Sequence, residues 1–176
     1  MNAQKTFGFT LIELMVTVSI SAIVLTLGVP GYTQMIQNNR MSAQANEFVA
    51  FLNLARSEAV KRGTRVTLCK SADGASCSGS GAWDQGWIVI VDSNNNATAD
   101  EGSPLAVHSD LGTSSLSGNS SVASYISFVG AGVTQLTSGG FQAGTLTLCS
   151  GISSVQGRSI VVSRTGRATV NKVSCS

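Results

Sequence analysis

The N-terminal part of the chain carries a long apolar run. Residues 9 to 29 read FTLIELMVTVSISAIVLTLGV, and Glu13 is the one charged residue among them. At about 1.5 Å of rise per residue, this run forms a helix of about 30 Å, which matches the hydrocarbon thickness of a bilayer. The pattern therefore predicts a membrane-spanning helix over residues 9 to 29.

An amphipathic pattern follows the apolar run. Pro30-Gly31 is expected to bend or break the helix, because proline lacks the N–H donor and clashes with the preceding turn. Helical spacing then resumes and is expected to end at Arg62-Gly63. Small and apolar residues spaced three or four apart form one stripe on this second half, namely Met41, Ala45, Phe48, Leu52, Ala55 and Ala59.

Two large apolar residues of the second half, Phe51 and Leu54, lie off this stripe. One interpretation is a helix that is half wrapped by its own domain. The other is a contact with a neighbouring subunit. Both interpretations place the stripe itself against the globular part of the chain.

After Gly63 the apolar pattern changes to short runs typical of strands, which lie at 65–70, 86–92, 104–110, 125–129, 145–149 and 158–170. Six or seven strands and one long helix predict an α+β fold. We expect the helix, residues 9–62, to pack on a β-rich head, residues 63–176. In that head, two small antiparallel sheets are expected to stack, with the helix against one of them.

The residues before Glu13 explain why a charge stands in the apolar run. A secretory signal peptide does not fit, because the run is too long and no A-x-A site follows it. Gly8-Phe9-Thr10-Leu11-Ile12-Glu13 instead resembles the type IV prepilin signature. The resemblance implies that residues 1 to 8 are a leader, that a prepilin peptidase cuts after Gly8, and that Phe9 becomes the methylated N-terminus.

The same resemblance implies a role for Glu13. A pilus packs its N-terminal helices side by side, so Glu13 of one subunit is expected to neutralise the Phe9 ammonium group of a neighbour. The implied partners are other major and minor pilins, the prepilin peptidase and an inner-membrane assembly platform. The implied location is the bacterial inner membrane, with the head in the periplasm, and the pilus fibre at the cell surface after assembly.

Composition agrees with a secreted filament subunit, since 43% of the residues are apolar and only 11% are charged. Four cysteines in a chain that crosses a membrane predict two disulfides in an oxidising compartment. Three pairings are possible, and we favour Cys69 with Cys77 and Cys149 with Cys175, because each pair brackets a strand-loop unit. Free thiols and zinc ligands are the alternatives, but the chain has no C-x-x-C or histidine pair, so we expect no metal.

A narrower resemblance covers nearly the whole chain. LNLARSEAVKRG at 52–63, VTLCKS at 66–71 and WDQGWIVIVDSNNNATADEG at 83–102 together resemble the GspH/FimT family of minor pilins and pseudopilins. The resemblance implies a low-copy subunit that helps to prime pilus assembly. Pro30 is usual in pilins and favours a pilus. The alternative is an H-type minor pseudopilin of a type II secretion system.

Basic residues gather in the C-terminal part of the chain. From residue 111 onward there is no acid, and the basic residues there are Arg158, Arg164, Arg167 and Lys172. Thr165-Gly166 predicts a two-residue hairpin turn, which would place Arg164 and Arg167 opposite one another. Strand alternation then puts Arg158 on the same face and Lys172 on the other.

The basic hairpin around Thr165-Gly166 suggests DNA as a further partner. Gly166-Arg167-Ala168-Thr169 resembles the C-terminal Gly-Arg-x-Arg motif through which some family members bind DNA, with threonine in place of the last arginine. Phosphate binding requires positive charges at backbone spacing, and the candidate residues are Arg158, Arg164, Arg167 and Lys172. The alternative is a solvated hairpin whose charges protect an edge strand from aggregation.

The sequence gives weaker support to other kinds of site. Residues 92–101 hint at a calcium loop but lack the EF-hand pattern, so a polar turn is favoured. Trp83 and Trp87 are expected to be half-buried packing residues rather than a stacking platform. His108 is the only histidine and is interpreted as structural. Because the chain has no G-x-S-x-G motif or P-loop, we expect neither an enzyme nor a cofactor.

Overall fold

The structure is a computed structural model that describes residues 8–152 and 155–175. The leader predicted at residues 1–8 therefore lies outside the described residues, except for Gly8. The chain divides into two compact units, residues 1–36 and residues 37–176.

One helix, α1 (Leu11–Arg62), contributes to both units. It continues without interruption through residues 30 and 31, so the predicted alternative of a break is wrong. A proline in an apolar helix removes one backbone hydrogen bond without ending the helix when its neighbours stay helical. The bend at Pro30 stays a prediction.

The C-terminal end of α1 lies where the sequence predicts it. Gly63 follows Arg62 with a φ of 64°, a left-handed conformation that glycine adopts without steric cost. The predicted stripe is confirmed, because all six of its residues are at most 1% exposed. The second half of α1 is thus an amphipathic helix whose apolar face is buried in the head.

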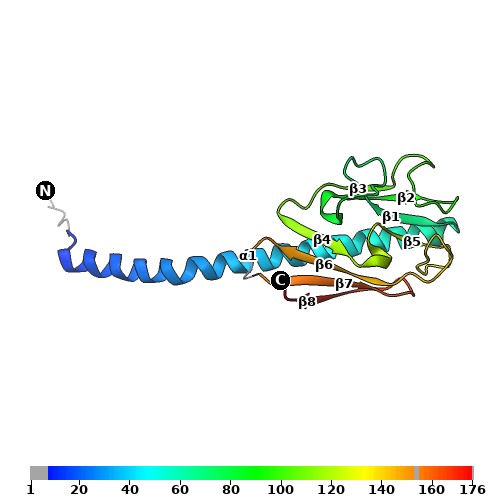
Figure 1. The fold of residues 1–176 in the computed structure, drawn as a ribbon. Helices are drawn as coiled ribbons and strands as arrows, with labels where there is room; N and C mark the ends of the chain where they lie inside the picture. Colours follow the sequence, from blue (N-terminus) through cyan, green and yellow to red (C-terminus); the bar gives the residue numbers. More distant parts are fainter. Residues whose placement is uncertain (1–7, 153–154, 176) are drawn as a thin grey trace. The chain divides into compact units, whose positions relative to one another are not determined.

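The head contains two four-stranded antiparallel sheets among the described residues (Figure 1). The first has the order β3-β2-β1-β5, with β1 (Val66–Lys70), β2 (Trp87–Val91), β3 (Ala106–His108) and β5 (Tyr125–Phe128). The second has the order β4-β6-β7-β8, with β4 (Ser114–Gly118), β6 (Gly144–Ser150), β7 (Gly157–Val162) and β8 (Ala168–Val173). Two 3₁₀ turns complete it, η1 (Trp83–Gln85) and η2 (Ser120–Val122).

Strand β4 was not among the predicted runs, because its sequence SSLSG has the composition of a loop. Its register with β6 turns Ser114 and Leu116 toward the core and leaves Ser115 and Ser117 exposed. Pairing with a neighbouring strand therefore outweighs local propensity here.

A single core joins α1 to both sheets. It contains the stripe of α1 together with residues of the first sheet, such as Leu68, and of the second, such as Leu146. The expectation that the helix packs against only one sheet is therefore wrong, and Figure 1 shows the second half of α1 running between the two. A helix inserted between two sheets buries a wider apolar surface than a helix laid on one.

Both tryptophans are fully buried in this core, so the expectation of half-buried side chains is wrong. The ring of Phe48 meets them edge to face, with centroids 5.4 Å from Trp83 and 5.0 Å from Trp87. The indole N–H of Trp83 donates to the Val122 carbonyl at 2.9 Å. A stacking platform for bases is not available in this arrangement, because neither ring reaches the surface.

The structure contains the two disulfides that the sequence favoured, Cys69–Cys77 and Cys149–Cys175. The first pins the loop after β1 across the outer face of the first sheet, where Ile88 and Ile90 are also buried. The second ties the C-terminal segment after β8 to the end of β6. Both crosslinks lie in the unit formed by residues 37–176.

Candidate functional site

The first candidate is the apolar segment at the start of α1. From Phe9 to Val29, the large apolar side chains that the structure describes are all at least 50% exposed. By length and composition, this part of the chain can cross a membrane. A continuous apolar surface of this kind indicates a lipid or protein partner, because it would not remain in contact with water.

Thr10 and Glu13 form the start of this helix. The backbone N–H of Glu13 donates to Thr10 Oγ1 at 3.3 Å, so threonine acts as the N-terminal cap. Thr-x-x-Glu is also the sequence of a capping box, in which the glutamate can support the cap. Sequence reasoning missed this second role, although the spacing was visible in the chain.

The Glu13 carboxylate has no ion-pair partner within the described residues. Glu58 forms ion pairs with Lys61 and Arg62, and the Glu47 carboxylate contacts the His108 ring. The Glu13 side chain is instead exposed in the first turn of α1. Any ion-pair partner of this carboxylate would therefore lie outside the described residues or on another molecule.

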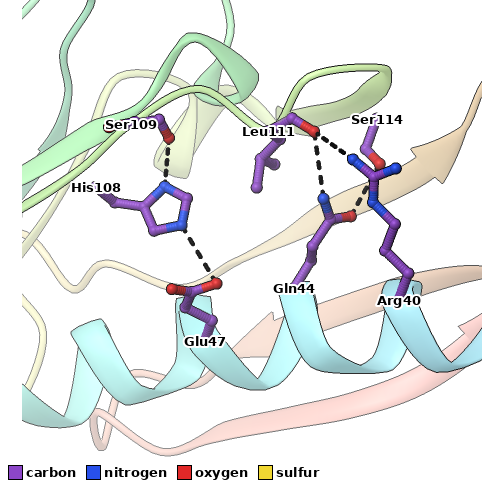
Figure 2. Close-up of polar contacts among 7 residues, drawn as sticks. All are labelled: Arg40, Gln44, Glu47, His108, Ser109, Leu111 and Ser114. Atoms are coloured by element: carbon purple, nitrogen blue, oxygen red, sulfur yellow. Dashed lines mark hydrogen bonds and ion pairs between the residues drawn. The ribbon is translucent and has the colours of Figure 1, made fainter.

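A polar seam fastens the connector between β3 and β4 to the second half of α1 (Figure 2). Gln44 Nε2 donates to the Leu111 carbonyl at 3.3 Å, and its Oε1 accepts from Ser114 Oγ at 2.8 Å. Arg40 Nη2 reaches the same Leu111 carbonyl at 3.5 Å. These polar side chains, which lie off the apolar stripe, thus hold a loop in place.

His108 belongs to the same seam and is structural, as expected. Its Nε2 lies 3.3 Å from a Glu47 carboxylate oxygen, and its Nδ1 contacts the Ser109 carbonyl (Figure 2). Its ring stacks on Trp87 with centroids 3.9 Å apart. Phe51 meets both rings edge to face, so this residue packs on its own domain, whereas Leu54 remains 36% exposed.

The basic hairpin has a different register from the predicted one. Ser163, not Arg164, lies opposite Arg167, with its N–H donating to the Arg167 carbonyl at 2.9 Å. Gly166 has a φ of 75° and occupies the third loop position, which gives a three-residue loop closed by a glycine bulge. The predicted two-residue turn is wrong, and Arg164 lies at the exposed tip of the loop.

Arg158 is not part of a surface patch. It is 6% exposed, and its guanidinium donates to the carbonyls of Asn38, Gln156 and Gly157 and to Ser42 Oγ. It pairs directly with Lys172, so these two share a face, contrary to the predicted alternation. Arg158 therefore clamps β7 to α1 and is removed from the candidate DNA-binding set.

The remaining basic residues, Arg164, Arg167 and Lys172, are exposed. The Arg164 guanidinium lies 5.2 Å from the ring centroid of Phe141, which is itself 72% exposed. A cation over an aromatic face is a favourable contact, and here it holds an arginine at the hairpin tip while leaving it open to solvent.

In the polar turn at residues 92–101, the carboxylate oxygens accept hydrogen bonds from protein groups. Asp92 accepts from Thr67 Oγ1 at 2.8 Å and from the backbone N–H groups of Asn96 and Ala97. Glu101 accepts from the hydroxyl and N–H of Ser93 and from the Asn94 N–H, and the Ser93 hydroxyl contributes most to lowering the pKa of Glu101. Across residues 8–152 and 155–175, no three His, Cys, Asp or Glu residues gather as metal ligands.

These features together define a class of protein. An exposed apolar helix with one acid in its first turn, joined to a disulfide-bonded β-rich head, is the architecture of a membrane-anchored assembly subunit. A family model described as "Type II transport protein GspH" matches residues 44–166, and one described as "Prokaryotic N-terminal methylation motif" matches residues 4–29. The chain belongs to the GspH family.

Solved structures share the fold. Two crystal forms of the type IV minor pilin FimU of Pseudomonas aeruginosa are 23% identical, with TM-scores of 0.57 and 0.55. They cover 76% and 74% of this chain and 89% and 91% of their own. The minor pseudopilin EpsH of the Vibrio cholerae type 2 secretion system is 10% identical, with a TM-score of 0.48, and the match covers 77% of this chain and 97% of EpsH. The two family-model matches make the chain a minor pilin or pseudopilin and not an enzyme.

Proposed function

We propose that this chain is a minor pilin that takes part in assembling and priming a type IV pilus. The observation that carries the proposal is the apolar first half of α1, whose described large apolar side chains from Phe9 to Val29 are exposed and which contains one charged residue, Glu13. Such a surface requires lipid before assembly and other apolar helices after it. The similarity of the fold to a type IV minor pilin and the presence of Pro30 support a pilus.

Processing is part of this proposal. A prepilin peptidase removes residues 1–8, and Phe9 becomes a methylated N-terminus, as the match to an N-terminal methylation motif supports. Before assembly the chain lies in the bacterial inner membrane with its head in the periplasm, in contact with an assembly platform. After assembly it lies in the pilus among other major and minor pilins, where Glu13 pairs with the Phe9 amine of a neighbour.

Deleting the gene tests the choice of system. The proposal expects loss of surface pili with protein secretion unchanged, and complementation in trans should restore piliation. Loss of secretion with normal piliation would contradict the proposal and favour a minor pseudopilin of a type II secretion system, which is the alternative that the GspH family itself includes.

DNA binding is a second candidate function. Its specific observation is the exposed Arg164–Phe141 pair at the hairpin tip, with Arg167 and Lys172 exposed on the same hairpin. Exposed arginines can neutralise backbone phosphates, and such binding weakens as salt rises. Arg158 does not contribute, because its guanidinium is consumed by contacts within the head.

A further inference from the structure

The two sheets of the head have four edges, and three of them are short or covered. Strand β3 has only three residues. Strand β4 lies against η1, and the connector before β4 is bonded to η1 through Leu111 N–H and the Asp84 carbonyl. Strand β5 is covered by the following segment, because Gln135 N–H donates to the Ser127 carbonyl at 3.0 Å.

Strand β8 is the edge that stays open. Over the described residues, its backbone groups make hydrogen bonds only with β7, and it lies at the outer side of its sheet in Figure 1. Its register is unbroken from Gly157↔Val173 to Val162↔Ala168, so β8 contains neither a bulge nor a proline. Bulges and prolines are common ways to blunt an exposed edge, and without them β8 keeps a regular ladder to which a strand can add, while its charges at Arg167 and Lys172 bear on which strand fits.

The register determines which backbone groups face outward. Ser163 N–H donates to the Arg167 carbonyl, so Ser163 and Arg167 form a hydrogen-bonded pair of the β7–β8 ladder. Hydrogen-bonded and non-hydrogen-bonded pairs alternate along an antiparallel ladder, so the next pair, Val162 and Ala168, and every second pair after it lack backbone hydrogen bonds to each other. Ala168, Val170 and Lys172 belong to those alternate pairs and direct their N–H and C=O groups away from β7. An incoming strand would therefore find donors and acceptors spaced for a regular ladder.

The charges around β8 determine what kind of strand fits. Arg167 and Lys172 flank the edge, Arg164 lies at the hairpin tip, and the chain has no acid from residue 111 onward. Two copies pairing antiparallel through β8 would gather Arg167 and Lys172 of both copies along one junction, and this accumulation of like charge disfavours a second copy as the occupant. A strand with acidic side chains would instead be complementary to this edge.

We propose that β8 is a docking edge for an extended, acidic strand supplied by another pilin subunit. The inference rests on the proposed minor-pilin function and names the chemistry of one of its partners. Backbone bonds to Ala168, Val170 and Lys172 supply the pairing, and the flanking cations select the partner.

Amide hydrogen exchange on the full-length protein in detergent tests this directly. The probe is a short synthetic peptide of alternating valine and glutamate, and its matched control replaces glutamate with lysine. With the glutamate peptide, exchange at the Val170 and Lys172 amides should slow by about tenfold or more. The Thr169 and Asn171 amides should not change, because they already bond to β7.

Three outcomes would overturn the inference. They are an unchanged exchange pattern, equal protection by the lysine peptide, and protection without peptide that grows with protein concentration, which would indicate a second copy. If exchange does not respond but gene deletion still abolishes pili, only this inference fails, and the minor-pilin function stands.

Variants sharpen the test. Val170→Pro removes one outward N–H without removing a bond to β7, so it should abolish protection by the peptide, whereas Val170→Thr keeps the N–H and should retain it. Replacing both Arg167 and Lys172 with glutamate should reverse the preference between the two peptides. A reversal cannot come from unfolding, and an unchanged preference would overturn the charge argument even if Val170→Pro fails to fold.

Discussion

The two halves of α1 differ in where their apolar residues find partners. From Phe9 to Val29, the described large apolar side chains are at least 50% exposed, whereas the stripe from Met41 to Ala59 is at most 1% exposed. The second half has its partner in its own head, because its apolar residues occupy one face. The first half carries large apolar side chains on every side rather than on one face, so its partners must be lipid or other subunits.

Matched substitutions in the two halves should reveal this difference most strongly. Phe48→Ala should lower the free energy of unfolding of the head by about 3 to 5 kcal/mol, because it removes a ring buried between Trp83 and Trp87. Ile20→Ala, which removes a side chain that is 56% exposed, should leave that free energy unchanged. Denaturant titration of the full chain in detergent, followed by tryptophan fluorescence, measures both. Equal losses would contradict the division between the halves.

Glu13 is the charged exception in the first half, and two variants separate its two roles. Glu13→Ala should leave leader cleavage intact but strongly reduce incorporation into pili, because losing one partner of a buried ion pair costs about 3 kcal/mol or more. Glu13→Gln retains the capacity to support the Thr10 cap but lacks the charge, so it should fail to the same extent. Quantifying the subunit in sheared pili measures incorporation.

Normal incorporation of the Glu13→Gln variant would assign the residue to helix capping. The leader itself is checked on the same material by mass spectrometry, which should show a chain that begins at methylated Phe9. An intact leader would return the chain to the class of plain membrane-anchored proteins.

The hairpin offers a smaller effect. Replacing Arg164 and Arg167 with alanine should weaken binding of duplex DNA at low salt and make the log-log salt slope less steep by about 1.8, or about 0.9 for each phosphate that is no longer neutralised. Replacing Lys61 and Arg62, exposed cations at the end of α1, removes the same charge and should leave the slope unchanged. Titrations of the full chain with DNA at several salt concentrations measure the slope for each variant. Equal slopes for the two variants would show that the hairpin does not bind DNA.

The smallest expected effect is on acid stability. Hydrogen bonds from Ser93 and Asn94 lower the pKa of Glu101, so the folded state holds the charged form more strongly than the unfolded state. Such a group contributes stability above its unfolded pKa of about 4.3, and this stability is lost as pH falls through the folded pKa. Unfolding titrations from neutral pH down should show a loss below about pH 4 that is shallower in Glu101→Gln. Identical pH profiles would contradict it.

Sequence reasoning predicted the helix well and the sheets incompletely. The stripe of α1 was visible because helical spacing alone decides which side chains share a face. Strand β4 was missed because its serines gain strand structure only by pairing with β6. The hairpin register was missed because the same sequence, Arg164-Thr165-Gly166, fits a two-residue turn or a three-residue loop. The positive φ of Gly166 belongs to the three-residue loop, and the sequence does not reveal which loop forms.

The site residues divide in the same way. Cys69–Cys77 and Cys149–Cys175 follow from local strand-loop order and were predicted. The burial of Arg158 was not, because its acceptors include Asn38 and Ser42, which are far away in the chain and meet it only when β7 packs on α1. A basic residue in a strand therefore cannot be assigned to a surface patch from spacing alone.

The pairing of Glu13 with a neighbour's N-terminus can be tested chemically in assembled pili. A lipid-soluble carbodiimide joins a carboxylate and an amine that are in contact, with loss of water, and mass spectrometry identifies the linked peptides. The account predicts a peptide in which Glu13 is joined by an amide bond to the N-terminal residue of another pilin. Recovery of the Glu13 peptide without such a link, carrying only the reagent, would contradict it.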